Sequence, residues 1–148
     1  MDLVGRKLGQ DGGESARELI AEMKATLAVL PRLYSGKPVE RLANAIEAVE
    51  DATLWLLDRK AAADHVAQQF QIGVGPCQHV GGWMLAKGAL AARAMLDRGE
   101  GDAAWLEGRI TLYEVYAANV LGHASSRLAA VGQGGDLLKR MSADVLAA

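Results

Sequence analysis

"PVERLANAIEAVEDATLWLL", residues 38–57, decides the fold class of this 148-residue chain. Its apolar residues recur at spacings of three and four, which is the period of one face of an α-helix. They are Val39, Leu42, Ile46, Val49, Thr53 and Leu56, widened by Ala43 and Leu57. Polar residues at Glu40, Asn44, Glu47 and Asp51 occupy the opposite face. The pattern predicts an amphipathic helix with one solvated side.

A helix is also predicted before this stretch, over residues 11–30. Asp11 and Glu14 have the spacing of a capping box, so we expect the helix to begin near Asp11. Its apolar residues are Ala16, Leu19, Ile20, Met23, Leu27 and Leu30. Pro31 limits the helix, and "YSGKP" (residues 34–38) is predicted to be a loop with Pro38 in a first helical position.

The segment 62–96 allows two interpretations. Either a loop at residues 73–76 separates two helices, or one long helix runs through Pro76 with a kink. An apolar stripe continues through "IGVGPCQHVGG", which favours one helix whose small residues let neighbouring helices approach closely. The stripe is Val66, Phe70, Gly73, Cys77, Val80, Met84, Gly88, Ala91 and Met95. The small residues are Gly73, Cys77, Gly81 and Gly88.

"DRGEGD" (residues 97–102) ends that helix, with Gly99 as the C-terminal cap and Asp102 as the next N-cap. A fourth helix follows, and its apolar face holds Leu106, Ile110, Tyr113, Ala117 and Val120. Two short helical segments are predicted at 124–131 and 136–146. The predicted fold is therefore all-α, an antiparallel helical bundle of about four long helices plus short C-terminal helices.

The composition excludes several classes of protein. Charged residues are 23% of the chain and the net charge is −2, without the basic cluster that a nucleic-acid partner requires. The sequence has no apolar run near the roughly 20 residues that span a membrane. One cysteine excludes an internal disulfide framework and suits a reducing compartment, so a cytoplasmic location is expected.

The residues that could carry chemistry are His65, Cys77, His79 and His123. Cys77 and His79 could form half of a metal site, but residues two apart on a helix point to different faces. Cys77 is more simply interpreted as a small core residue than as a nucleophile. No catalytic, cofactor-binding or metal-binding residue is therefore predicted in this chain.

Two further patterns are tempting and also have structural interpretations. "GVGPCQ" (residues 73–78) lacks the third glycine of a dinucleotide fingerprint, a preceding strand and a Walker lysine. Burial within an apolar stripe would raise the pKa of a carboxyl group and suit it to acid–base catalysis. The paired carboxylates, such as Glu50 with Asp51, lie outside the stripes. Trp55, Trp83 and Trp105 lie off the main stripes, so we expect them to wedge between helices or against a partner rather than stack on a flavin.

Four stretches together resemble acyl-CoA dehydrogenases, which are flavoproteins that oxidise the α,β carbon–carbon bond of acyl-CoA thioesters. "DLVGRKLGQDGG" (residues 2–13) is similar to a segment late in these enzymes. "ATLWLL" (52–57), "VGGWMLAKGALAARAML" (80–96) and "RITLYEVYAANVL" (109–121) resemble the acetyl-CoA dehydrogenase-like C-terminal domain of one branch. The family often has Leu-Pro after the fourth helix, whereas this chain has Leu121-Gly122, which weakens that turn.

The resemblance implies which parts of the parent enzyme lie elsewhere. The family's catalytic glutamate belongs to a Tyr-Glu-Gly-Thr-like stretch before the segment that matches residues 1–8. The parts that bind FAD and the thioester lie further upstream. Residues 1–10 are therefore expected to be a remnant of the exit from a catalytic domain, with Met1 an internal residue and 11–148 the helical bundle. Without native partners, the first ten residues are expected to be poorly ordered or packed on a neighbouring copy.

Two functions follow as hypotheses. The favoured one is a non-catalytic helical domain that braces the catalytic body of the FAD-dependent parent and supports subunit association, as a homo-oligomer or with the catalytic part. The alternative is a stand-alone helical module that binds a protein partner, or an acyl group in a groove lined by Phe70, Met84 and Met95. Thiol or metal catalysis through Cys77 is a third, weaker idea.

Overall fold

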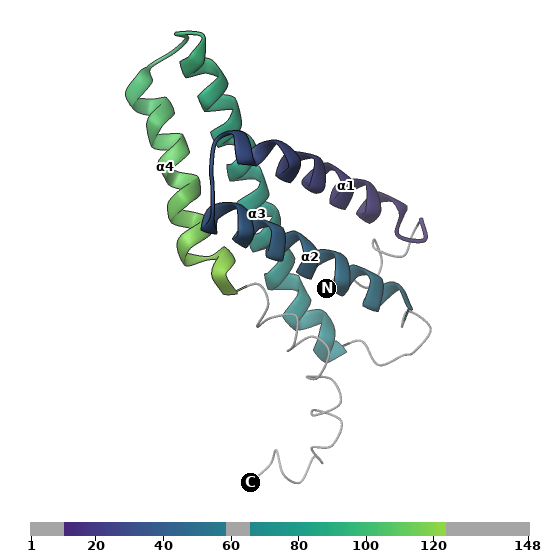
Figure 1. Cartoon of the computed structure of the whole chain (residues 1–148). Coiled ribbons are helices and arrows are strands. Elements are labelled where there is room, and N and C mark those ends of the chain that lie inside the picture. The colour runs from purple at the N-terminus through teal and green to yellow at the C-terminus, as the bar shows by residue number, and fades with distance from the viewer. Residues whose placement is uncertain (1–10, 59–65, 124–148) are drawn as a thin grey trace, which may run out of the picture.

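The computed structural model describes residues 11–58 and 66–123, without the side chains of Leu56 and residues 66–77. Within these ranges every regular element is a helix, so the all-α prediction is confirmed. The elements are α1 (Glu14–Val29), the 3-10 helix η2 (Leu30–Arg32), α2 (Lys37–Asp58), α3 (Val66–Asp97), α4 (Ala103–Asn119) and the 3-10 helix η3 (Leu121–His123). Figure 1 shows two helical hairpins, in which α1 and α2 lie side by side and cross the longer α3–α4 pair. Residues 1–10 and the predicted segments 124–131 and 136–146 lie outside the described residues.

The first helix begins at Glu14, three residues later than the sequence predicts, and its N-cap residue is Gly13, although the Asp11 side chain still caps the first turn. The Asp11 carboxylate accepts hydrogen bonds from the backbone N–H groups of Gly13 (2.9 Å), Glu14 (3.1 Å) and Ser15 (3.0 Å), and from the Ser15 hydroxyl. The hydrogen bonds from Ser15 are the main reason that the pKa of Asp11 is lowered to about 2. The N-cap residue Gly13 has φ +86, a left-handed conformation that suits glycine.

The apolar stripe of α2 packs inward as predicted. Leu42, Ile46, Val49 and Thr53 are buried, whereas Glu40, Asn44, Glu47 and Asp51 are exposed. The turn between α3 and α4 also follows the prediction. Gly99 has φ +68, and the Asp102 side chain accepts a hydrogen bond from the backbone N–H of Trp105 at 2.8 Å.

The interpretation of α3 as one long helix is confirmed, because it is continuous from Val66 to Asp97. The predicted stripe was wrong in its register, however. Met84 and Ala91 are exposed, and the buried face instead carries Trp83 and a row of alanines, Ala86, Ala89 and Ala92. In this part of α3 apolar residues of the helix itself lie on nearly every side, so the periodicity of the sequence does not select one inward face. The small alanine side chains do, because they let α3 approach its neighbours closely.

The core between the two hairpins contains Met23, Leu30, Leu42, Ile46, Trp83, Tyr113 and Leu121. Two tyrosines tie the hairpins together in opposite directions. The Tyr34 hydroxyl donates to the carbonyl of Ile110 on α4, and the Tyr113 hydroxyl donates to the carbonyl of Pro38 on α2, each at 2.8 Å. Their ring centroids lie 5.1 Å apart. Burial raises the pKa of both hydroxyls, so they remain neutral donors over the physiological range.

A close approach between α3 and η3 occurs at Gly82, which is buried. A Cβ atom added at Gly82 would lie 2.7 Å from Cδ2 and 2.9 Å from Cδ1 of Leu121. Leu121 is itself 1% exposed, so its side chain has little room to move. The prediction that small residues on α3 allow close approach is correct in kind. Of the predicted glycines, Gly81 makes a close approach, since an added Cβ would lie 3.1 Å from the Tyr116 hydroxyl, whereas Gly88 has only an ordinary 3.8 Å contact to Arg109. The closer contact at Gly82 was not predicted.

Candidate functional site

The structure does not assemble the candidate chemical residues into a described site. His79 is buried in α3 and His123 is exposed in η3. His65 and the side chain of Cys77 lie outside the described residues. Among the residues that are described, no group of three or more His, Cys, Asp or Glu side chains could hold a metal ion.

Two carboxylates of the first hairpin, Glu50 and Glu22, form ion pairs on its surface. Lys24 Nζ lies 2.6 Å from Glu50 Oε2, which joins α1 to α2. Lys87 Nζ lies 2.6 Å from Glu22 Oε1, which joins α3 to α1, and also 4.7 Å from the centre of the Trp83 ring. These side chains are largely exposed, so each pair contributes little to stability. Their arrangement indicates helix pairing and not acid–base chemistry.

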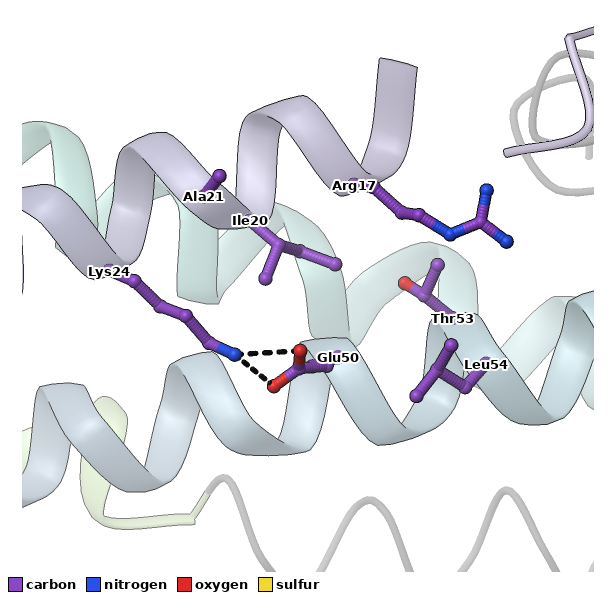
Figure 2. Close-up of a pocket in the computed structure, with 7 residues that line it drawn as sticks. All are labelled: Arg17, Ile20, Ala21, Lys24, Glu50, Thr53 and Leu54. Atoms are coloured by element: carbon purple, nitrogen blue, oxygen red, sulfur yellow. Dashed lines mark hydrogen bonds and ion pairs between the residues drawn. The ribbon is translucent and has the colours of Figure 1, made fainter. Parts of the chain in front are cut away.

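A shallow pocket of about 210 Å³ lies between α1 and α2. Figure 2 shows its lining, which is Arg17, Ile20, Ala21, Lys24, Glu50, Thr53 and Leu54. Its polar groups are already used: Lys24 pairs with Glu50, Arg17 donates to the carbonyl of Gly12 at 3.1 Å, and Thr53 donates to the carbonyl of Val49 at 2.7 Å. The volume is below the roughly 300–1,000 Å³ of typical small-molecule and cofactor sites. The pocket therefore does not provide a site for a flavin dinucleotide.

The acyl-binding groove expected beside Phe70, Met84 and Met95 is not supported at its described positions. Met84 is 54% exposed and points out of the bundle. Met95 is half-buried and faces the turn before α4, where an added Cβ at Gly101 would lie 3.4 Å from its terminal methyl group. The Phe70 side chain lies outside the described residues. Met84 belongs to the outer surface of the second hairpin.

That surface is the most unusual feature of the described structure. Helix α4 is apolar on two sides, and only one of them is covered. The covered side carries Leu106, Tyr113 and Ala117, which are buried. The other side carries Trp105, Leu112 and Val115, which are 62%, 43% and 53% exposed. A helix that is apolar all round is usually buried.

Met84 of α3 lies on the same side of the hairpin. It is flanked along its helix by Gly81 and Gly88, and an added Cβ at these glycines would lie 3.1 Å from the Tyr116 hydroxyl and 3.8 Å from the Arg109 guanidinium. Leu112 lies between Arg109 and Tyr116 on the facing helix. We define the outer face as Met84, Trp105, Gly108, Leu112 and Val115. An added Cβ at Gly108 meets nothing within 4 Å, so the centre of this face is open.

Arg109 borders the outer face. Its guanidinium carbon lies 5.4 Å from the centre of the Trp105 ring, which is a cation–π distance. Within the described residues no carboxylate forms an ion pair with Arg109. Tryptophan and arginine are over-represented among the residues that dominate protein–protein binding. The outer face therefore has the composition of an interaction surface.

The three tryptophans differ in burial, and only Trp83 is shown in one of the expected roles. Trp83 wedges between helices: it is 5% exposed, and its indole N–H donates to the Thr26 hydroxyl of α1 at 2.8 Å. Trp55 is partly buried. Trp105 points outward and is 62% exposed. The apolar face predicted for α4 is its covered side. The outer side was not predicted, although residues 105, 108, 112 and 115 also have helical spacing.

Comparisons with known proteins identify a matching family and a similar enzyme. The model of the family described as "Acetyl-CoA dehydrogenase C-terminal like" matches residues 19–142. The 3-methylmercaptopropionyl-CoA dehydrogenase of Ruegeria pomeroyi is 32% identical over 143 residues, which cover 93% of this chain and 24% of that enzyme. No solved structure matches the chain significantly. No helix in the described part of the chain is long and apolar enough to cross a membrane.

Proposed function

The chain belongs to the family of acetyl-CoA dehydrogenase C-terminal-like domains, and from this premise we propose that it braces the catalytic body of an acyl-CoA dehydrogenase and supports subunit association. In this proposal the complete enzyme oxidises acyl-CoA thioesters at the α,β bond. The bundle itself takes no part in the chemistry.

The observation that carries this proposal is the uncovered apolar side of α4. Trp105, Leu112 and Val115 are between 43% and 62% exposed, although each would be more stable out of water. Burying this side against a larger body would stabilise both parts, at roughly 25 cal/mol for each Å² of apolar surface. The relative supports the same view, because the matched region is 24% of its length and leaves most of the enzyme outside the match.

The frame behind α4 suits a bracing role. The paired hydrogen bonds of Tyr34 and Tyr113 fix α4 to the first hairpin, and the Tyr116 hydroxyl fixes it to α3 by donating to the carbonyl of Gln78 at 3.0 Å. Arg41 adds a hydrogen bond of 3.2 Å to the carbonyl of Ala117. A surface held by four such contacts keeps its shape when a partner leaves, which lowers the entropic cost of binding.

Flavin and the catalytic base belong, in this proposal, to the portion of the enzyme outside the chain. The pocket between α1 and α2 is too small for FAD, and its cationic groups already have partners. No catalytic step is therefore assigned to a described residue.

The proposal can be tested on the purified chain and in the cells that make it. The purified chain should show no visible flavin absorbance and no acyl-CoA-dependent reduction of an electron acceptor. In cell extracts fractionated by size, an antibody to the chain should detect it together with acyl-CoA dehydrogenase activity. Stoichiometric FAD on the isolated chain, or detection of the chain only in fractions without that activity, would refute the proposal.

A further inference from the structure

We propose that the outer face docks on the catalytic portion of the acyl-CoA dehydrogenase, against an apolar surface that presents a carboxylate to Arg109. This inference rests on the proposed function and adds to it the surface used and the chemistry of the partner.

The apolar half of the inference comes from exposure and shape. Met84, Trp105, Leu112 and Val115 expose large side chains on one side of the α3–α4 hairpin. Gly108 leaves open space between Trp105 and Leu112, since an added Cβ there would meet no atom within 4 Å. Glycine in the middle of an exposed helix lowers helix stability by about 1 kcal/mol relative to alanine. A partner side chain that packs against the bare backbone at Gly108 would offset this cost.

The charged half comes from Arg109. Its guanidinium lies over the face of the Trp105 ring, and none of the described carboxylates forms an ion pair with it. When a partner covers Trp105, the adjacent guanidinium also loses water. A buried charge is tolerated when it is paired and hydrogen-bonded, so the partner must supply an acceptor, and a carboxylate matches the guanidinium best.

A second copy of the chain does not supply that acceptor. In an antiparallel two-fold pair of α4 helices, the same flank of each helix meets its counterpart, so Arg109 would face its own equivalent. Like charges in such a position oppose association. In a parallel pair Arg109 would face the opposite flank of the outer face, which is centred on Thr111, whereas Glu107 and Glu114 lie farther round α4, away from the contact. A different surface that carries a carboxylate therefore fits better than self-association.

Photo-crosslinking in the cells that make the protein tests the inference. A photo-reactive phenylalanine replaces Leu112 in the full chain, and the same residue at the exposed position Glu47 on α2 serves as the matched control. Mass spectrometry should identify crosslinked peptides from the catalytic portion of an acyl-CoA dehydrogenase with the probe at 112 and not at 47. Arg109→Glu should reduce the yield about tenfold, whereas Arg109→Lys should retain most of it. Circular dichroism checks that each variant is folded.

Three results would overturn the inference: crosslinks from position 112 only to another copy of the chain, crosslinks only to a protein outside the dehydrogenase family, or a yield no greater than at position 47. An unchanged yield in folded Arg109→Glu would overturn the carboxylate partner. If the chain still fractionates with dehydrogenase activity in these cases, the proposed function stands and only the docking surface is wrong. If the chain also separates from that activity, both proposals fail.

Discussion

Replacing Gly82 with alanine should destabilise the domain, whereas the same change at Gly88 should stabilise it. Both residues lie within α3, so both substitutions gain the same intrinsic helix preference, about 1 kcal/mol. They differ in what the new methyl group meets. At Gly82 it would lie 2.7 Å from Leu121 Cδ2, and at Gly88 the nearest atom is the Arg109 guanidinium nitrogen at 3.8 Å. The first distance requires a buried side chain to move, and the second is an ordinary contact.

Overpacking of this kind costs about 1–3 kcal/mol, so Gly82→Ala should be near neutral to about 2 kcal/mol less stable than the unmodified domain. Gly88→Ala should be up to about 1 kcal/mol more stable. The difference between the two variants isolates the cost of overpacking, because the helix term is common to both. Thermal melts followed by circular dichroism should separate them by about 3 °C for each kcal/mol in a domain of this size.

A double-mutant cycle provides the control. In a Leu121→Ala background the added methyl group has space, so Gly82→Ala should cost less than it does in the unmodified chain. If Gly82→Ala melts at or above the temperature of Gly88→Ala, the packing of η3 against α3 is not as tight as described. Additive effects of Gly82→Ala and Leu121→Ala would lead to the same conclusion.

Three further outcomes follow from hydrogen bonds described above. Tyr113→Phe should lower the free energy of unfolding by about 1–2 kcal/mol in urea titrations, because the carbonyl of Pro38 loses its buried donor. Burial raises the pKa of Tyr34 and Tyr113 in the folded state. Their contribution to stability is therefore fully present below the ordinary tyrosine pKa of about 10 and is lost as the pH rises beyond it. Urea titrations between pH 9 and 12 should show this loss of stability, and the variant with phenylalanine at both positions should lose less. The pKa of Asp11 is lowered to about 2. The stability from its capping hydrogen bonds is therefore present above the ordinary carboxyl pKa of about 4 and is lost as the pH falls towards 2. Helicity measured by circular dichroism should fall over that range in the unmodified chain, and by a smaller amount in Asp11→Ala.

The sequence predicts the helices of this domain well because their signals are local. The α2 stripe, the cap at Asp102 and the left-handed Gly99 each depend on residues within a few positions of one another. The inward face of α3 was wrong because its selection is not local. Trp83 turns inward to reach the Thr26 hydroxyl, 57 positions earlier in the chain, and no periodicity within α3 contains that information.

The outer face illustrates a different limit. Leu112 and Val115 have helical spacing with Trp105 on one side of α4. The residues on the covered side have the same spacing among themselves. A sequence with two apolar sides shows that a helix needs two neighbours, but it does not show which side the rest of the same chain covers. The hydrogen bonds of Tyr34 and Tyr113 settle that question for the side that faces α2.

The paired tyrosine contacts also determine how long the first hairpin of a nascent chain waits before α4 is synthesised and can pack on it. Tyr34 and its acceptor Ile110 are 76 positions apart, and Tyr113 and its acceptor Pro38 are 75 positions apart. At a synthesis rate of about 5–20 residues per second, the first hairpin leaves the ribosome roughly 4–15 s before α4 can cover it. During that interval Leu42 and Ile46 face water, so this is when a chaperone would have most to bind and when premature association between neighbouring nascent chains is most favourable.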